Sequence, residues 1–487
     1  MKNKLKEPPR VAVKFANMVL VLGIVLAFLI VIRYLYALFY PLDGPYPDFM
    51  LPAIYQYYFK IIIACLIIAT LLGLGLKKLS NNLKASLSLS FFTVGIVVYG
   101  FETFLEFSTK TSQKEIIAKQ MGVSYDSRTT IEVLNDLRDS GFEALPNVRS
   151  AFLVKSNGLT SDKGRIYPLG TISNTTTIFS NESGYYPVIE TDEHGFNNPK
   201  GLYEENKVDI VLTGDSFTEG YSVHSNETIS AVLRQSDFNV ISVGKGNNGP
   251  LIELAALKEY AEPLKPKIVL WLYGINDMFD LGSEMKSSLL SKYLNEDDYS
   301  QNLISRQKEI DGVLINYVQV EWEKKKNKEK ERVENNTNWT TNINEVIYNN
   351  RIIKILKLSN LRIKITLTPN AYSVSIPTPI FRDVLQKSKQ MVSNWNGKIY
   401  FVYLPAFTRY STGNKDPHRD FVMQTATELD IPIIDIHNEV FDPHLDPLSL
   451  FPFRVSSHYN AEGYKLVAEA IGRRLEADGY VPIKSKK

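Results

Sequence analysis

Apolar runs near the amino terminus constrain this chain more than any other feature. Residues Phe15–Ile32 include no charged side chain, and together with Arg33 and Tyr34 they are long enough to cross a bilayer as a helix. Two further apolar runs follow. We therefore predict an anchor over residues 1–107 with three membrane-spanning helices, at about residues 13–36, 53–76 and 85–107.

Two of these runs have alternative interpretations. The third carries Glu102 and Glu106 in its last turns, so the alternative is a buried or interfacial helix. The first could be a signal peptide, but it is long and no small-residue cleavage site follows it, which favours a retained span.

The distribution of basic residues predicts the orientation of the anchor. Five basic residues precede the first run and three lie between the second and third, whereas residues 33–48 contain only one. Basic segments stay in the cytoplasm. With three spans, everything after Phe107 is then extracytoplasmic, as in the periplasm beside a cytoplasmic (inner) membrane; with two spans it would face the cytoplasm.

Composition narrows the remaining possibilities. A net charge of +2 argues against a nucleic-acid partner. The single cysteine, Cys65, cannot form a disulfide within the chain, and the sequence has no Cys/His cluster of metal-binding spacing. His437 and His444 lie near Asp435 and Asp442, but loop histidines are common, so we expect neither a metal nor a cofactor.

From Lys207 onward the chain alternates between strand-like and helix-like segments, which predicts a parallel sheet with helices on both faces. We expect a flavodoxin-like three-layer α/β/α domain over residues 186–478. The predicted strands are 207–213, 239–243, 267–273, 361–367, 398–404 and 431–436, and the predicted helices are 228–235, 251–260, 379–393, 417–429 and 461–477.

The remaining segments are less regular. Residues 108–185 contain a helical pattern at Ile131–Arg138 and a Ser/Thr/Asn-rich stretch, and we interpret them as a linker with an accessory layer on the main domain. Residues 281–351 are polar and charged, which predicts a solvated helical insertion. Residues 479–487 form a short tail.

Polar residues follow the predicted strands at their carboxyl ends, where parallel sheets bind ligands. Ser216 lies in Gly214–Gly220 after the first strand, a glycine loop at 244–250 follows the second, and Asn276 follows the third. His458 precedes the last helix. Taken singly, Ser216 could belong to a strand-ending turn, Asn276 could cap a helix, and His458 could brace one.

Together these blocks resemble the SGNH (GDSL-like) hydrolase superfamily over roughly residues 186–478. The matching residues are Gly214-Asp215-Ser216, the glycine loop around Gly246, Gly274-Ile275-Asn276-Asp277 and His458-Tyr459-Asn460-Ala461-Glu462-Gly463.

The resemblance implies a role for each matching residue. Ser216 would be the nucleophile, with its backbone N–H facing the oxyanion, and His458 would be the general base. Asn276 and a backbone N–H of the glycine loop would complete the oxyanion site. We choose Gly246 for that N–H; Gly244, Asn247 and Gly249 are the alternatives. Asp215 and Asp277 would have supporting positions.

One position departs from the family pattern. Val455 stands three residues before His458, where the family has an aspartate. Either a backbone carbonyl holds the second ring nitrogen of a Ser–His dyad, or an acid reaches in from elsewhere; the nearest acids in sequence are Asp435, Asp442 and Asp446. A third alternative is an inactive relative.

These observations favour a membrane-anchored serine esterase that acts on an acylated glycan, such as an envelope glycan or exopolysaccharide, or on a small acyl ester, with O-acetyl as the expected acyl group. The alternatives are an O-acyltransferase using the same site and an inactive glycan-binding or scaffolding protein. Its partners would be this substrate and the lipid bilayer. Nothing in the sequence indicates an oligomeric state.

Overall fold

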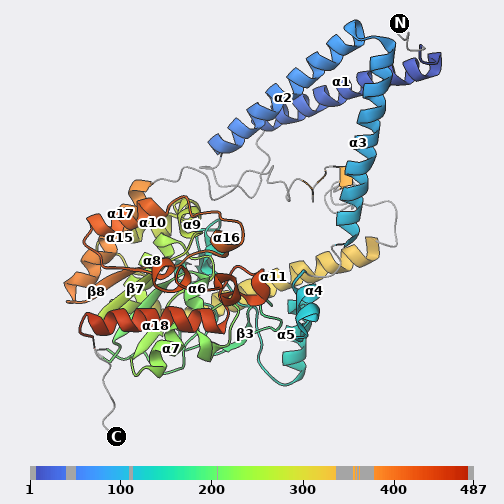
Figure 1. Ribbon diagram of the computed structural model, residues 1–487. Helices are drawn as coiled ribbons and strands as arrows, with labels where there is room; N and C mark the ends of the chain where they lie inside the picture. The colour runs from blue at the N-terminus through green and yellow to red at the C-terminus, as the bar shows by residue number, and fades with distance from the viewer. Residues whose placement is uncertain are drawn as a thin grey trace. The chain divides into compact units, whose positions relative to one another are not determined.

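A computed structural model describes residues 7–39, 51–108, 113–205, 207–335, 355–356, 358, 361 and 378–480 of the 487-residue chain. The chain divides into two compact units, which are described separately (Figure 1). The first comprises Met1–Thr111 and Asn338–Ser375, and the second comprises Ser112–Thr337 and Ile376–Lys487. The accessory segment therefore belongs to the same unit as the predicted sheet.

The first unit contains the helices α1 (Arg10–Phe39), α2 (Leu51–Lys78) and α3 (Asn81–Ser108). Each is long and apolar enough to cross a membrane, and together they cover the three predicted spans. Helices α1 and α2 pack through small and branched side chains, among them Ala27 and Cys65. Most of their other large apolar side chains are exposed, which suits helices whose surroundings are hydrocarbon.

Glu102, which weakened the prediction of the third span, is buried in α3. Its carboxylate accepts the backbone N–H of Leu361 at 2.8 Å. The Tyr99 hydroxyl donates to the carbonyl of Leu356 at 3.4 Å. Residues from far along the chain thus contact this helix. The predicted strand 361–367 lies, apart from Leu361, outside the described residues.

The second unit is built on a parallel five-stranded sheet, ordered β6-β5-β7-β8-β9 in the described part of the chain. In chain order this is 2-1-3-4-5, the flavodoxin-like order of a three-layer α/β/α domain, so the predicted fold class is confirmed. The strands are β5 (Ile210–Gly214), β6 (Val240–Ser242), β7 (Ile268–Tyr273), β8 (Lys398–Tyr403) and β9 (Ile433–Asp435).

Helices cover both faces of the sheet because alternate strand residues point in opposite directions. On one face, Leu212 and Leu270 share a core with α7 and α18, which lie side by side in Figure 1. On the other face, Phe381 of α15 packs against Tyr273 and Phe401. The bounds of these helices are Ile229–Gln235 for α7, Ala461–Ala477 for α18 and Thr378–Asn394 for α15. A further helix, α8 (Pro250–Ala256), packs against α15 and β5.

The predicted insertion begins within helix α9 and continues through α10 and α11. Asp311 of α11 accepts bonds from the backbone N–H and the hydroxyl of Ser173, at 2.9 and 2.7 Å. Trp322 receives the guanidinium of Arg138 over its ring at 4.8 Å. The described part of the insertion therefore packs against the accessory segment. The helices are α9 (Asp277–Glu284), α10 (Ser288–Asn295) and α11 (Gln307–Asn335); residues 336–351 lie outside the described part.

The accessory segment forms helices and two short hairpins. The helical pattern at 131–138 is α5, whose first turn is closed by a capping box between Thr129 and Glu132. The Ser/Thr/Asn-rich stretch contributes β3, which pairs with β4 in an antiparallel manner. The elements are α4 (Gln113–Met121), α5 (Thr130–Asp139), β1 (Leu159–Ser161), β2 (Gly164–Ile166), β3 (Thr176–Ile178) and β4 (Val188–Glu190).

Candidate active site

Ser216 lies at the first position of a four-residue helix, α6 (Ser216–Glu219), directly after β5. The turn between them needs Gly214, because a Cβ atom there would lie 2.7 Å from the carbonyl oxygen of Leu272 in the neighbouring strand. Asp215 caps the helix by accepting the N–H of Phe217 at 2.9 Å. This sharp turn holds Ser216 at the carboxyl end of β5, an interior strand of the sheet, where the side chain is half-buried.

His458 stands beside Ser216 as the resemblance implies. The Ser216 Oγ lies 2.7 Å from the His458 Nε2, although the two residues are 242 positions apart in sequence. The imidazole packs against the rings of Phe217 and Tyr221, with centroids 4.9 and 5.2 Å away. Asn460 then caps α18 by accepting the N–H of Gly463 at 3.0 Å. Packing and the helix start together fix the direction of the imidazole.

The second nitrogen of His458 meets a carboxylate that motif spacing does not indicate. His458 Nδ1 lies 2.9 Å from the Oε2 of Glu182, and both side chains are mostly buried, with exposed fractions of 14% and 13%. The same oxygen accepts the hydroxyls of Ser222 and Ser456 at 2.8 and 3.1 Å. An unbroken line of contacts thus runs from Ser216 through His458 to Glu182.

The surroundings of Glu182 favour its charged form. Burial by itself raises the pKa of a carboxyl group, but the hydrogen bond and charge of His458 oppose this, and Lys114 and Ser222 add to their effect. The balance lowers the pKa of Glu182 to about 2. Glu182 is therefore an anion at any pH at which the protein would work.

The loop that carries Glu182 is held by its neighbours. Asn181 donates to the carbonyl of Asp126 at 2.7 Å and accepts the N–H of Gly184 at 2.8 Å. Asp126 in turn donates its N–H to the carbonyl of Gly184 at 2.8 Å. On the other side, the Ser183 hydroxyl donates to the carbonyl of Ser222 at 2.6 Å. The loop that carries the acid is thus held by Asp126 of the accessory segment and by Ser222, which follows α6.

The acids expected near His458 on sequence grounds lie elsewhere. Asp446 forms an ion pair with Arg454 at 2.5 Å, and Asp435 pairs with Arg419 at 2.5 Å. Asp442 is exposed at the end of a short helical turn. The expectation that one of these three aspartates contacts His458 is thereby corrected, because Glu182 contacts its Nδ1 instead. Closeness in sequence does not imply closeness in the fold.

The backbone shortly before His458 adopts an unusual conformation. Phe453 and Arg454 have positive φ values of 52° and 60°, a conformation that side chains other than glycine seldom adopt. The Phe453 ring packs against Tyr125 of the accessory segment, with centroids 6.1 Å apart. Val455 therefore follows a distorted turn that contacts the accessory segment, the same part of the chain that supplies Glu182.

Asn276 lies next to the nucleophile turn, as predicted. A Cβ atom at Gly274 would lie 2.9 Å from Asp215 Oδ2 and 3.2 Å from Asn276 Oδ1, so both side chains border this glycine. The Asn276 amide donates to Asp280 Oδ2 at 2.8 Å. Its side chain thus lies at the glycine that Asp215, the neighbour of Ser216 in sequence, also borders, and it is held by a carboxylate.

Gly246 does not direct its N–H at Ser216. That N–H donates to Glu219 Oε2 at 2.6 Å, and the N–H of Gly249, an alternative donor, goes to Glu284 Oε1 at 2.6 Å. The choice of Gly246 as an oxyanion donor is therefore not supported by this geometry. The physical reason is that a buried carboxylate must be satisfied, and these N–H groups satisfy it.

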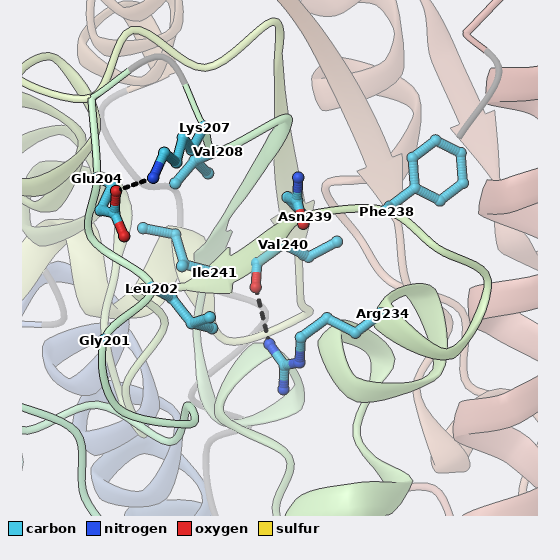
Figure 2. Close-up of a pocket in the computed structure, with 10 residues that line it drawn as sticks. All are labelled: Gly201, Leu202, Glu204, Lys207, Val208, Arg234, Phe238, Asn239, Val240 and Ile241. Carbon is cyan, nitrogen blue, oxygen red and sulfur yellow. Dashed lines mark hydrogen bonds and ion pairs between the residues drawn. The ribbon is translucent and has the colours of Figure 1, made fainter. Parts of the chain in front are cut away.

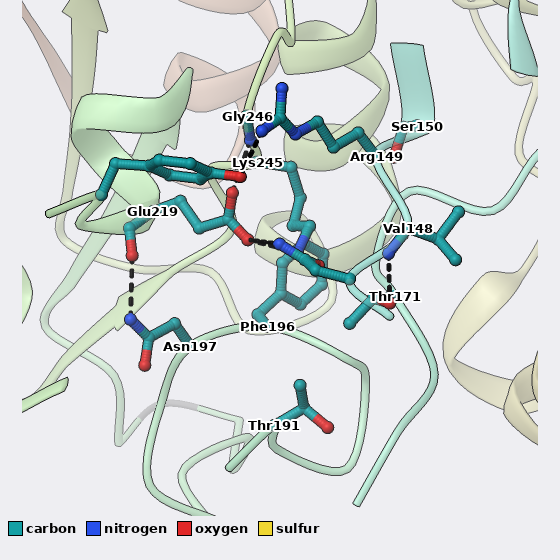
Figure 3. Close-up of polar contacts among 12 residues, drawn as sticks. Val148, Arg149, Ser150, Thr171, Thr191, Phe196, Asn197, Glu219, Lys245 and Gly246 are labelled. Atoms are coloured by element: carbon teal, nitrogen blue, oxygen red, sulfur yellow. Dashed lines mark hydrogen bonds and ion pairs between the residues drawn. The ribbon is translucent and has the colours of Figure 1, made fainter. Parts of the chain in front are cut away.

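Glu219 is the centre of a buried polar cluster with Lys245 and Gly246 (Figure 3). It forms an ion pair with Lys245, whose side chain is 2% exposed while that of Glu219 is 1% exposed. Asn147 of the accessory segment donates to Glu219 at 3.1 Å and accepts from Lys245 at 2.8 Å. This cluster fixes the glycine loop to α6 and to the accessory segment.

Asp215 and Asp277 are both fully buried beneath the site. Burial raises the pKa of each carboxyl group. Besides its cap on α6, Asp215 borders Gly274, and Asp277 accepts the N–H of Gly274 at 2.9 Å. Both residues therefore shape the turns that carry Ser216 and Asn276, which is consistent with supporting positions.

A cavity of about 300 Å³ lies at the opposite ends of the strands (Figure 2). It is lined by residues that precede or begin β5 and β6, and Arg234 donates to the carbonyl of Val240 at 2.9 Å within it. Neither Ser216, His458 nor Glu182 lines it. The candidate active site is therefore the rim at the carboxyl ends and not this cavity.

In the described part of the chain, no group of three or more His, Cys, Asp or Glu side chains is arranged to hold a metal ion. His437 instead contacts Arg409 through Nε2 at 2.7 Å and the Tyr410 hydroxyl through Nδ1 at 2.8 Å. Burial and the nearby Arg409 charge lower the pKa of His437, which suits a neutral ring in a structural position.

No protein-family model matches the chain, and no curated protein matches it. Among solved structures it is similar to a protein described as lipolytic, of the G-D-S-L family, from Desulfitobacterium hafniense, at 15% identity and a TM-score of 0.30, covering 55% of this chain and 98% of that one. It is also similar to the esterase EstA from Pseudoalteromonas, at 10% identity, 55% and 97% coverage and a TM-score of 0.28.

A third similar structure is the acetylxylan esterase Axe2 from Geobacillus stearothermophilus, at 14% identity and a TM-score of 0.30, covering 58% of this chain and all of that one. In each case the likeness extends over little more than half of this chain. The contacts around Ser216, rather than these likenesses, carry the functional conclusion below.

Proposed function

We propose that this chain is a membrane-anchored serine esterase whose catalytic residues are Ser216, His458 and Glu182. The observation that carries the proposal is the line of contacts from Ser216 Oγ to His458 Nε2, at 2.7 Å, and from His458 Nδ1 to Glu182, at 2.9 Å. A nucleophile, a base and an orienting acid in hydrogen-bond contact are the arrangement that activates a serine hydroxyl.

Each residue has a defined part in acyl transfer. As Ser216 attacks the acyl carbon, its proton passes to His458 Nε2, and a tetrahedral intermediate forms. Glu182 accepts the Nδ1–H of His458, so it holds the tautomer that can take this proton and stabilises the imidazolium. His458 then returns the proton to the leaving alcohol. Water repeats the sequence on the acyl-enzyme and releases the acid.

The oxyanion needs donors at the same rim. Ser216 is the first residue of α6, so its own N–H has no acceptor within the helix and is available to the oxyanion. The Asn276 amide is the second donor; to reach the oxyanion it exchanges its bond with Asp280. Gly246 is excluded from this role by its bond to Glu219.

The substrate class follows from location and from the resemblance. With three spans and basic residues on the cytoplasmic side, the catalytic unit would be extracytoplasmic, where acylated envelope glycans or exopolysaccharides occur. We propose an O-acetylated glycan as the substrate. Protease treatment of spheroplasts tests the location: digestion of the catalytic unit is expected, and its protection would contradict the three-span orientation.

An acetyl ester assay tests the chemistry. The full chain, purified in detergent, should release acetate from acetylated sugars, and Ser216→Ala should reduce release to the uncatalysed rate. Equal rates for the two proteins would contradict the esterase proposal. Adding a sugar acceptor and comparing free acetate with newly acetylated sugar distinguishes hydrolysis from acyl transfer.

A further inference from the structure

Arg149 carries a positive charge at the edge of the candidate site and forms an ion pair with no carboxylate in the described part of the chain. Its Nη1 donates to Asn247 Oδ1 at 2.5 Å, and its Nη2 donates to the Tyr221 hydroxyl at 2.6 Å. Both acceptors are neutral, and within the described residues Arg149 forms no ion pair. Figure 3 shows its guanidinium beside Gly246. A part-buried cation is normally paired with an anion. The guanidinium of Arg149 is therefore suited to binding an anionic group of a ligand.

The nearest carboxylate is already committed to other donors. Glu219 is enclosed by Lys245, Asn147 and the N–H of Gly246. Lys245 balances its charge, so the positive charge of Arg149 is left over at the rim. Because Lys245 is buried and Arg149 is half-buried, Arg149 is the one of the two that a ligand can reach.

Aromatic rings hold the guanidinium in place. Its carbon lies 5.1 Å from the centroid of the Tyr221 ring and 5.6 Å from that of Phe152. The Phe152 side chain is 58% exposed, which leaves an apolar surface beside the charge. A fixed guanidinium next to an exposed aromatic ring is suited to a sugar that carries an anionic group, because the ring contacts the sugar face and the charge binds the anion.

Arg149 is also close enough to act on the reacting substrate. The Tyr221 ring centroid lies 5.1 Å from the guanidinium carbon and 5.2 Å from the His458 ring, so the guanidinium and the imidazole are at most about 10 Å apart. One sugar residue with its acyl group covers such a span. The accessory segment would thus contribute both the acid, Glu182, and a substrate contact.

We propose that Arg149 binds an anionic group, a carboxylate or a phosphate, on the acylated sugar, so that the site selects acidic glycans. This inference rests on the proposed esterase function and names its substrate class. Arg149 is a binding residue in this account and takes no part in the proton transfers.

The test compares three acetylated substrates with the full chain in detergent: methyl glucoside, methyl glucuronoside and glucose 6-phosphate. We expect the wild type to have a kcat/KM about 10- to 100-fold higher on one or both anionic sugars than on the glucoside. In Arg149→Gln this ratio should fall to about one. Of the two anionic sugars, the one with the larger ratio identifies the natural anion, and the ratio should shrink as salt is added.

Controls distinguish the outcomes. Arg165→Gln removes a charge from the same segment, where the guanidinium bonds only carbonyl groups in the described structure, and it should keep the wild-type ratio. An Arg149→Gln variant that loses activity equally on all three substrates would make Arg149 a structural brace and overturn the proposal. A wild type with equal kcat/KM on all three substrates would also overturn the proposal. Acetate release no faster than in Ser216→Ala on any substrate would instead refute the esterase function itself.

Discussion

Glu182 and Glu219 are two mostly buried carboxylates near the same ring, Tyr221, and they have different partners. Glu219 bonds Lys245 and the backbone N–H of Gly246. Neither partner gives up its charge or its hydrogen in the proposed reaction. Glu182 bonds His458, which in the proposed mechanism gains and loses a proton as Ser216 reacts. We infer that the partner decides the role: the permanent ion pair with Lys245 gives Glu219 a structural role, and contact with the proposed general base gives Glu182 its proposed catalytic role.

The sharpest test of this comparison is Glu182→Gln. The glutamine cannot stabilise the imidazolium and can hold the wrong tautomer of His458, so kcat should fall by about two to four orders of magnitude. Acetate release under saturating substrate measures this. Glu182→Asp, which keeps the charge but shortens the reach, should recover part of the activity. A Glu182→Gln variant with wild-type kcat would mean that His458 needs no acid.

Glu219→Gln should affect folding rather than chemistry. It leaves the buried Lys245 without its anion, and breaking such a pair costs about 3–5 kcal/mol of folding free energy. Denaturant unfolding followed by tryptophan fluorescence, with Trp271 buried in β7, measures the change. Glu205→Gln, which removes the exposed partner of Lys265, is the matched control and should leave the folding free energy nearly unchanged, because water screens an exposed pair. Equal free energies of unfolding for Glu219→Gln and the wild type would contradict the structural role of Glu219.

Asn181→Ala should have a smaller effect, because it loosens the loop and leaves the carboxylate in place. Loss of the bonds to Asp126 and Gly184 should lower kcat about tenfold and leave KM nearly unchanged. Asn135→Ala, which replaces an exposed asparagine in α5 of the same segment, is the control. If kcat of Asn181→Ala equals that of the control, the loop is held by other contacts.

The smallest expected effect is on the folding stability of the protein at acid pH. The pKa of Glu182 is lowered to about 2, against about 4.3 in an unfolded chain, so its stabilising contribution is present above about pH 4 and is lost as pH falls toward 2. The difference in melting temperature between the wild type and Glu182→Gln should therefore shrink between about pH 5 and pH 2. A difference that stays constant over this range would show that the carboxylate gains no stability from His458.

Local pattern was sufficient to predict much of the molecule. The strands that carry Ser216 and Asn276 and the helix that follows His458 are visible as apolar periodicity and turn residues, because these features depend on neighbours in sequence. Parallel strands then place their carboxyl ends at one rim, so the pairing of Ser216 with His458 could be expected. The three apolar helices followed from length and hydrophobicity alone.

The acid and the glycine-loop donor could not be predicted in the same way. Glu182 lies 276 residues before His458 in a segment with no motif, and only the packing of its loop against Asp126 and Ser222 brings it to the imidazole. Gly246 was chosen by spacing within a loop, yet spacing does not show where an N–H points. The one available signal was Val455, which showed that the usual aspartate is missing and left open a dyad, an acid from elsewhere or an inactive relative.

The sequence by itself therefore determined the three apolar helices, the α/β/α fold and the positions of Ser216 and His458 at one rim, since each depends on local periodicity or on the ends of parallel strands. Tertiary structure alone decided that the segment after the anchor belongs to the catalytic unit and supplies Glu182 and Arg149. The physical reason is that hydrogen bonds and ion pairs act over about 3 Å in space, whatever number of residues separates the two groups along the chain.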